Sequence, residues 1–169
     1  MPGRALRDAE RQTAKTTAEQ RGSEQVGHAV FVSEVVKPAR KAPAGIRRVW
    51  ALCDEWLDYV AKPVFAGGCF FISATAEFDA RPGRVRDAVA AARRDWRNLY
   101  ETTIADAIRL GKISAQVTAG DLAFELDAVS RAAGEDALLH DDASVYERAR
   151  GILLARLRAV STGTAPELG

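Results

Sequence analysis

The clearest periodic pattern in the chain is an amphipathic helix over residues 44–62. Apolar side chains recur there three and four positions apart, at Ile46, Val49, Trp50, Cys53, Trp56, Leu57 and Val60. This spacing puts them on one face of an α-helix, while the acidic residues Asp54, Glu55 and Asp58 fall on the opposite face. Lys62-Pro63, followed by a glycine pair, predicts where the helix ends.

The next segment, residues 69–80, is apolar on every side. It carries no charge before Glu77, and its apolar positions are Cys69, Phe70, Phe71, Ile72, Ala74, Ala76 and Phe78. A helix of this kind is buried on all sides, so we expect it at the centre of a bundle. The alternative, a strand over Cys69–Ile72, would have no partner strand.

A long helix is predicted between Pro82 and Gly111. Proline suits a first helical turn and glycine a left-handed C-terminal cap, and the interval gives a helix of about 40 Å at 1.5 Å per residue. One stripe joins Val85, Val89, Ala92, Trp96, Leu99, Thr103, Ala107 and Leu110. Tyr100, Ile104 and Ile108 widen the stripe, so the second half should contact two neighbours.

Three further helices complete the pattern. The first begins at a Ser23 cap and ends at Pro38 and Pro43. The second follows a hydroxyl cap at Thr118, and the third opens with a capping box over Ser144–Glu147. The sequence therefore predicts an all-α bundle of about six helices over residues 25–160, with a polar, frayed or disordered segment 1–24 and a loose tail 161–169.

Composition narrows the function without identifying it. The net charge of +1 favours neither nucleic acid nor an anionic membrane. The longest uncharged run, Pro63–Ala76, is shorter than the roughly 20 apolar residues that a membrane-spanning helix needs. Cys53 and Cys69 lack CxxC spacing and are typical of buried thiols in a reducing cytosol, with a disulfide between them as the alternative. We expect a cytoplasmic protein with no membrane partner.

The chain shows no catalytic motif. His28 and His140 lie on different predicted elements, and the glycine pair at 67–68 lacks the lysine of a phosphate loop. Glu77 and Asp79 could do acid–base work only if their environments separated their pKa values, and no base, metal ligand or nucleophile accompanies them. We therefore expect no enzyme activity, no catalytic residue, no metal and no cofactor.

Aromatic residues gather on three successive predicted helices. They are Trp50, Trp56, Tyr59, Phe70, Phe71, Phe78, Trp96 and Tyr100. Two interpretations are open: the rings fill the core, as aromatics at helical spacing mostly do, or they line a cavity between the helices.

Several segments, taken in order, resemble the C-terminal regulatory domain of tetracycline-repressor-type (TetR) transcription regulators. They are Glu34–Ala39, Ala42–Gly45, Ala51–Val60, Gly67–Phe71, Glu77–Gly83, Leu110–Ile113 and Leu122–Asp127. Their order and spacing carry the resemblance, which covers about residues 26–160.

The resemblance implies a helical bundle with a small-molecule pocket and a homodimer built by the last two helices. The implied ligand is small and hydrophobic or aromatic. The pocket would be lined by Trp50, Cys53, Trp56, Phe70, Phe71, Phe78, Trp96 and Tyr100. The dimer face, on residues 119–134 and 144–160, would use Leu122, Phe124, Leu126, Val129, Ile152, Leu153, Leu154 and Leu157.

One part of the family pattern is not matched. The family carries an N-terminal helix-turn-helix for DNA recognition, and residues 1–24 are too few to hold it. The sequence thus predicts a ligand-sensing, homodimerising domain that binds DNA only if a head is supplied elsewhere. The alternative hypotheses are a headless module that heterodimerises with full-length relatives, and a small helical enzyme using Glu77 or Asp79.

Overall fold

The structure is a computed structural model that describes residues 27–62, 74–75, 77–80 and 82–162. Within these residues the fold is all-α, as predicted, and Ile113 and Ser161 form an isolated β-bridge. The named elements are η1 (Val32–Val36), α2 (Lys37–Lys41), α3 (Ile46–Ala61), α5 (Arg84–Arg109), α6 (Ala119–His140) and α7 (Ser144–Val160). Residues 27–41 form one continuous helical run, which with α3, α5, α6 and α7 makes five main helices in the described residues. The predicted helix over residues 69–80 would be the sixth.

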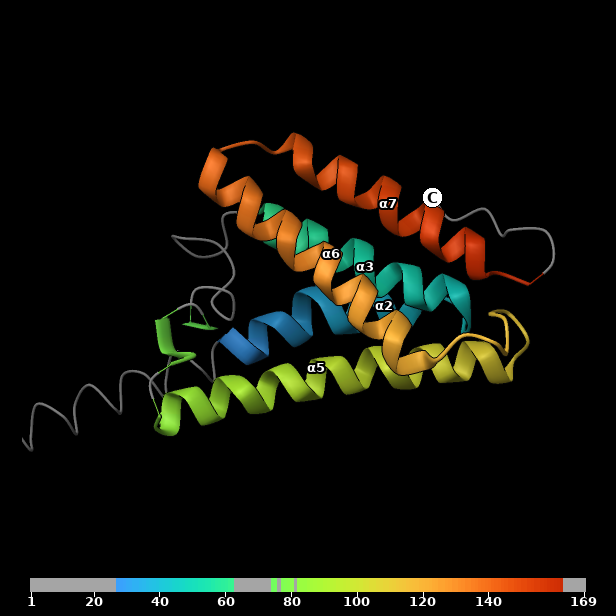
Figure 1. The fold of residues 1–169 in the computed structure, drawn as a ribbon, viewed down its shortest axis with the longest axis horizontal. Helices are drawn as coiled ribbons and strands as arrows, with labels where there is room; N and C mark the ends of the chain where they lie inside the picture. Colours follow the sequence, from blue (N-terminus) through green and yellow to red (C-terminus); the bar gives the residue numbers. More distant parts are fainter. Residues whose placement is uncertain (1–26, 63–73, 76, 81, 163–169) are drawn as a thin grey trace, which may run out of the picture.

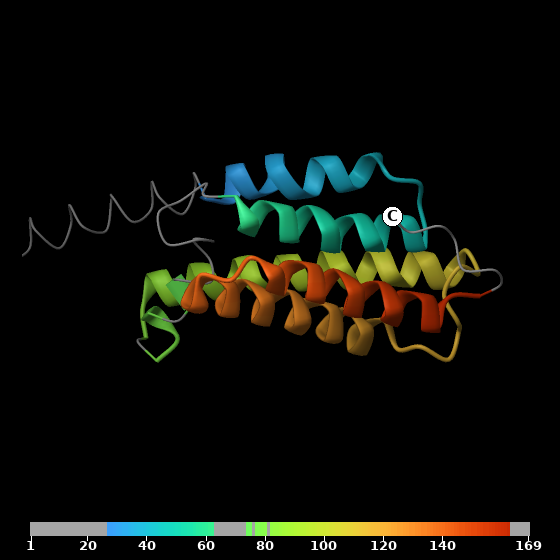
Figure 2. The ribbon, with the colours of Figure 1, turned by 90° about the horizontal axis from the view of Figure 1, so that it is seen from above.

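The helix α3 contacts all the other main helices. It packs against η1 and α2 on one side, against α5 and α6 on another, and against α7. In Figure 1, α5 runs along one edge of the bundle, and both views (Figures 1 and 2) show α6 and α7 as an antiparallel pair. We expected residues 69–80 at the centre, but most of that segment lies outside the described residues; of the part described, Ala74 is buried and Phe78 half-buried.

The apolar stripe predicted for α3 is confirmed. All seven of its residues are buried, together with Leu52 and Tyr59. The two extra residues widen the buried face because α3 meets neighbours on several sides.

The prediction that Pro38 ends the first helix was wrong. The helical run continues through Pro38 to Lys41, and the chain becomes extended at Ala42, directly before Pro43. Pro38 has no N–H to donate, and a proline ring crowds the carbonyl four residues earlier. Immediately before it the chain makes a π-turn, in which the N–H of Lys37 bonds to the carbonyl of Val32.

The helix α5 ends as the sequence predicts. Its 26 residues span about 39 Å at 1.5 Å per residue. Gly111 adopts φ 63°, and the N–H of Lys112 bonds to the carbonyl of Ala107 over 2.9 Å, which completes a Schellman cap. At the other end Pro82 is not in the first turn as predicted: α5 starts at Arg84, and Gly83 (φ 148°) before it has a non-helical backbone.

The predicted capping box at the start of α7 was also wrong. Ser144 is already inside the helix, and its N–H donates to Oδ1 of Asp142 over 2.9 Å. The hydrogen bonds from Ser144 lower the pKa of Asp142. At the start of α6, Thr118 is the N-cap residue, but its side chain makes no capping hydrogen bond.

The end of α7 is attached to the loop after α5. The N–H of Ser114 bonds to the carbonyl of Val160 over 2.9 Å, and the N–H of Thr162 bonds to the carbonyl of Lys112 over 3.3 Å. These bonds hold the C-terminal end of α7 beside the turn that leads into α6.

Candidate functional site

A cavity of about 240 Å³ lies between the helical run 27–41, α3 and α5. Its wall is mainly apolar and aromatic, with charged groups among the lining residues. They are His28, Phe31, Val32, Val36, Arg40, Trp56, Ala92, Arg93, Asp95, Trp96 and Leu99. A concave apolar site with few polar groups is typical of a small-molecule pocket.

Aromatic rings connect the cavity wall to the core. The Trp96 ring meets Phe31 edge to face, with centroids 4.8 Å apart, and meets Tyr100 in the same way at 4.7 Å. Phe31 also contacts Tyr59 at 5.9 Å. These T-shaped contacts are the arrangement that ring quadrupoles favour, so Trp96 is held from two sides while it borders the cavity.

The residues predicted to line one pocket do not lie together in the structure. Trp56 and Trp96 line the cavity. Phe78 lines a second cavity of about 170 Å³ between the Ala74–Asp79 region and the first turns of α5. Phe70 and Phe71 lie outside the described residues.

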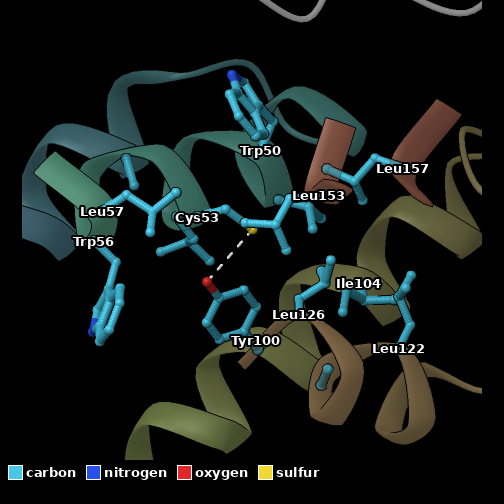
Figure 3. Packing of buried hydrophobic residues seen from close by; sticks show 14 of the residues in the cluster. Trp50, Cys53, Trp56, Leu57, Tyr100, Ile104, Leu122, Leu126, Leu153 and Leu157 are labelled. Carbon is cyan, nitrogen blue, oxygen red and sulfur yellow. Dashed lines mark hydrogen bonds between the residues drawn. The ribbon is translucent and has the colours of Figure 1, made fainter. Parts of the chain in front are cut away.

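Trp50, Cys53 and Tyr100 lie in the hydrophobic core (Figure 3) and are not among the residues that line the cavity. The Tyr100 hydroxyl donates to Sγ of Cys53 over 3.5 Å, and both side chains are completely buried. Burial raises the pKa of the Cys53 thiol to about 12 and raises that of Tyr100 well above its ordinary value. Cys53 is therefore an inert core thiol at neutral pH.

The sequence interpretation missed the contribution of the first helix. Phe31, Val32 and Val36 line the cavity from the run 27–41, and Arg40 lines it from one turn after Val36. The signal was present in the four- and five-residue spacing of the apolar residues, but the assumption that Pro38 ends the helix separated Arg40 from it.

Arg93 is the charged residue most firmly fixed at the cavity. Its Nη2 donates to Oδ2 of Asp127 on α6 over 3.0 Å, and the same oxygen accepts from Nε of Arg131 over 3.3 Å. The Asp127 side chain is 5% exposed and that of Arg93 is 22% exposed. Burial lowers the pKa of Arg93, and the nearby Asp127 carboxylate opposes this change; the guanidinium stays charged at neutral pH.

The two carboxylates that the sequence analysis considered for acid–base chemistry lie on the surface. Glu77 and Asp79 are exposed. A search of the part of the chain that is described finds no group of three or more His, Cys, Asp or Glu side chains placed to hold a metal ion.

Comparison with known proteins identifies the family. The family model of the tetracyclin repressor-like C-terminal domain matches residues 45–153, which is well over half of the chain. The chain belongs to this family.

A solved TetR transcriptional regulator from Chloroflexus aurantiacus J-10-FL has a similar fold. The TM-score is 0.68 at 23% sequence identity, and the match covers 79% of this chain and 69% of that one. Among curated proteins the comparison gives no significant match. No helix in the described residues has the length and apolar character needed to cross a bilayer.

The residues predicted for the dimer face of this TetR-type domain differ in how far they are buried within the single chain. Leu122, Leu126, Leu153 and Leu157 are fully buried within the single chain, where α6 and α7 meet the core. Val129 and Leu154 are half-buried, whereas Phe124 is 58% exposed and Ile152 49% exposed.

Charged residues connect α7 of the TetR-type domain to its neighbours. Arg150 donates from Nε to Asp54 and from Nη1 to Glu147, each over 2.7 Å, and from Nη2 to Asp58. Asp54 and Asp58, on the face of α3 opposite its apolar stripe, thus hold α7 in place. On the outer side, both oxygens of Glu125 on α6 accept from Arg156, over 2.5 and 3.2 Å.

Proposed function

We propose that residues 25–160 are the ligand-sensing and homodimerising domain of a TetR-type transcription regulator, which acts in the cytoplasm and not as an enzyme. The observation that carries the proposal is the aromatic cavity between the run 27–41, α3 and α5. Family membership supports the regulatory role, and the exposed Phe124 and Ile152 support the dimer.

The size and chemistry of the cavity favour a small aromatic ligand. Apolar cavities of about 150 Å³ accept a benzene ring. At about 240 Å³, with the indoles of Trp56 and Trp96 in its wall, this cavity has room for a molecule of one or two rings. Burial of such a molecule against aromatic side chains is favourable because it removes apolar surface from water.

The position of the cavity suits a sensor. Its walls come from three separate helices, and the run 27–41 borders it with Phe31, Val32 and Val36. A ligand that prefers one spacing of these helices over another shifts the equilibrium between the two spacings. The run 27–41 also contains a π-turn, a local irregularity often found at functional sites.

Titration with neutral 2-naphthamide, within a panel of other neutral one- and two-ring aromatics, tests the proposal. We expect calorimetry to show saturable binding to the wild-type chain and none to Ala92→Trp, because the new indole fills the cavity. Ala105→Trp is the matched control, since Ala105 is exposed on the same helix. Absence of binding by every compound of the panel, or equal binding to Ala92→Trp, would contradict the proposal.

A further inference from the structure

Arg93 is one of the residues that line two cavities. It lines the main cavity together with Trp56 and Trp96, and it lines the second cavity together with Phe78. A molecule in either space therefore meets the same cation.

Most of the donors of Arg93 are not used within the described residues. A guanidinium carries five N–H groups. In the described part of the chain its one hydrogen bond is from Nη2 to Asp127. Asp127 fixes the guanidinium from the α6 side, which leaves further donors for a bound acceptor and lowers the entropy lost when it binds.

The charge around Arg93 favours an anion. Asp127 is shared between the two guanidiniums of Arg93 and Arg131, so the cluster of these three groups has a net positive charge. The Glu135 carboxylate lies 3.7 Å from Nη1 of Arg131, but its side chain is 55% exposed and its charge is therefore screened by water. At the cavity itself, Arg40 adds a second cation.

The other polar groups of the cavity change the net charge that a bound anion meets only a little. Asp95 and His28 also line the cavity, and both are exposed, as is Arg40. Charges in contact with water are screened, whereas a partly buried guanidinium interacts more strongly with an opposite charge. Arg93 is therefore the cation that a bound anion would meet at the lowest dielectric.

We propose that the cavity selects a small aromatic molecule carrying one carboxylate, which accepts hydrogen bonds from Arg93 while its ring lies against Trp56 and Trp96. This inference rests on the proposed ligand-sensing function and adds the chemical class of the ligand. Asp127 acts as a positioning residue that holds the guanidinium toward the ring site.

A matched pair of probes separates the contribution of the negative charge to binding from that of the aromatic ring. 2-Naphthoate and 2-naphthamide have nearly the same shape, but only the first is an anion. We expect calorimetry to give about tenfold or tighter binding of 2-naphthoate to the wild-type chain, because hydrogen bonds to a charged acceptor are roughly twice as strong as neutral ones. Arg93→Met removes this preference, and Arg40→Met, the control for an exposed cation at the same cavity, retains most of it.

A second measurement uses the unaltered chain, in case Arg93→Met folds poorly. In NMR spectra, 2-naphthoate should shift the Nε–H signal of Arg93, and 2-naphthamide should shift it less. Equal affinities for the two probes, or an anion preference that survives in Arg93→Met and is lost in Arg40→Met, overturns the inference and leaves the proposed function standing. If neither probe nor any panel compound binds, the proposed function fails as well.

Discussion

Arg93 on α5 and Asp127 on α6 are joined by a hydrogen bond of 3.0 Å between Nη2 and Oδ2. This bond links the wall of the cavity to the helix pair on which the family resemblance places the dimer face. Because Asp127 also accepts from Arg131, one buried carboxylate holds two guanidiniums. A ligand that moves Arg93 therefore also changes the surroundings of α6.

Asp127→Asn should destabilise the domain by about 2 kcal/mol, because it leaves the partly buried Arg93 without a counter-charge and leaves Arg131 with only the exposed Glu135. Urea denaturation measures the change. The exposed carboxylate Asp106, which pairs with Arg109, provides the control: Asp106→Asn should cost less than about 0.5 kcal/mol. Equal effects of the two substitutions would mean that burial of Asp127 contributes nothing.

Trp96→Ala should cost about 2–3 kcal/mol, below the 3–5 kcal/mol typical of a fully packed tryptophan, because one side of the ring already faces the cavity. The variant should lose affinity for 2-naphthamide more than it loses stability. Leu57→Ala, at a fully buried site outside the cavity, is the comparison for stability and should leave probe binding unchanged. A loss above about 4 kcal/mol for Trp96→Ala would indicate packed core at this position.

Cys53 should react with a disulfide reagent far more slowly in the folded protein than in urea. Its pKa of about 12 leaves very little thiolate at pH 8, and the side chain is completely buried. The experiment uses a Cys69→Ser background, so that Cys53 is the one thiol that can react. Equal rates in the folded and unfolded states would contradict the buried position.

The Cys53 thiol also makes the unfolding free energy depend on pH, and the sign of this dependence follows from the raised pKa. The unfolded thiol ionises near its ordinary pKa of 9, whereas the folded thiol stays protonated up to about 12. The unfolded state thus binds fewer protons in that range, and its ionisation lowers the unfolding free energy by up to about 1.4 kcal/mol per pH unit above pH 9. In the Cys69→Ser background, Cys53→Ser should reduce this slope, and an unchanged slope would show that Cys53 does not contribute to it.

Phe124→Asp should convert a homodimer into monomers. Light scattering should give about twice the chain mass of 18.3 kDa for the wild type and the chain mass for the variant. The physical reason is that a carboxylate buried in an apolar interface loses its hydration without gaining a partner. Leu110→Asp, at an exposed apolar residue outside α6 and α7, should leave the dimer intact. A monomeric wild type would contradict the dimer proposal.

The periodicity of apolar residues was enough to predict the five main helices of the described residues but not the cavity. Burial of Cys53, Leu57 and Val60 follows directly from their spacing on α3. Yet Trp56, on the predicted face of α3, and Tyr100, on that of α5, differ in role: Trp56 borders an open space, whereas Tyr100 is enclosed by core side chains. Spacing specifies which side of a helix a residue occupies, and the gaps between helices depend on how all of them pack.

The sequence could not predict the ion pairs between residues far apart in the chain either. Arg150 and Asp54 are 96 positions apart, and Arg93 and Asp127 are 34 apart. Each of these residues belongs to the charged set that amphipathic patterns assign to a solvated face. Only the packing of α7 on α3, and of α6 on α5, brings the opposite charges together.

The three tryptophans provide the most direct test of the central claim, that the space between the run 27–41, α3 and α5 is a ligand site. NMR spectra should show one indole N–H signal for each of Trp50, Trp56 and Trp96, and of these three residues only the last two line the cavity. Saturating 2-naphthamide should shift the Trp56 and Trp96 signals and leave the Trp50 signal in place. A shift confined to Trp50, or no shift of the cavity pair under conditions where the probe is bound, would contradict the account.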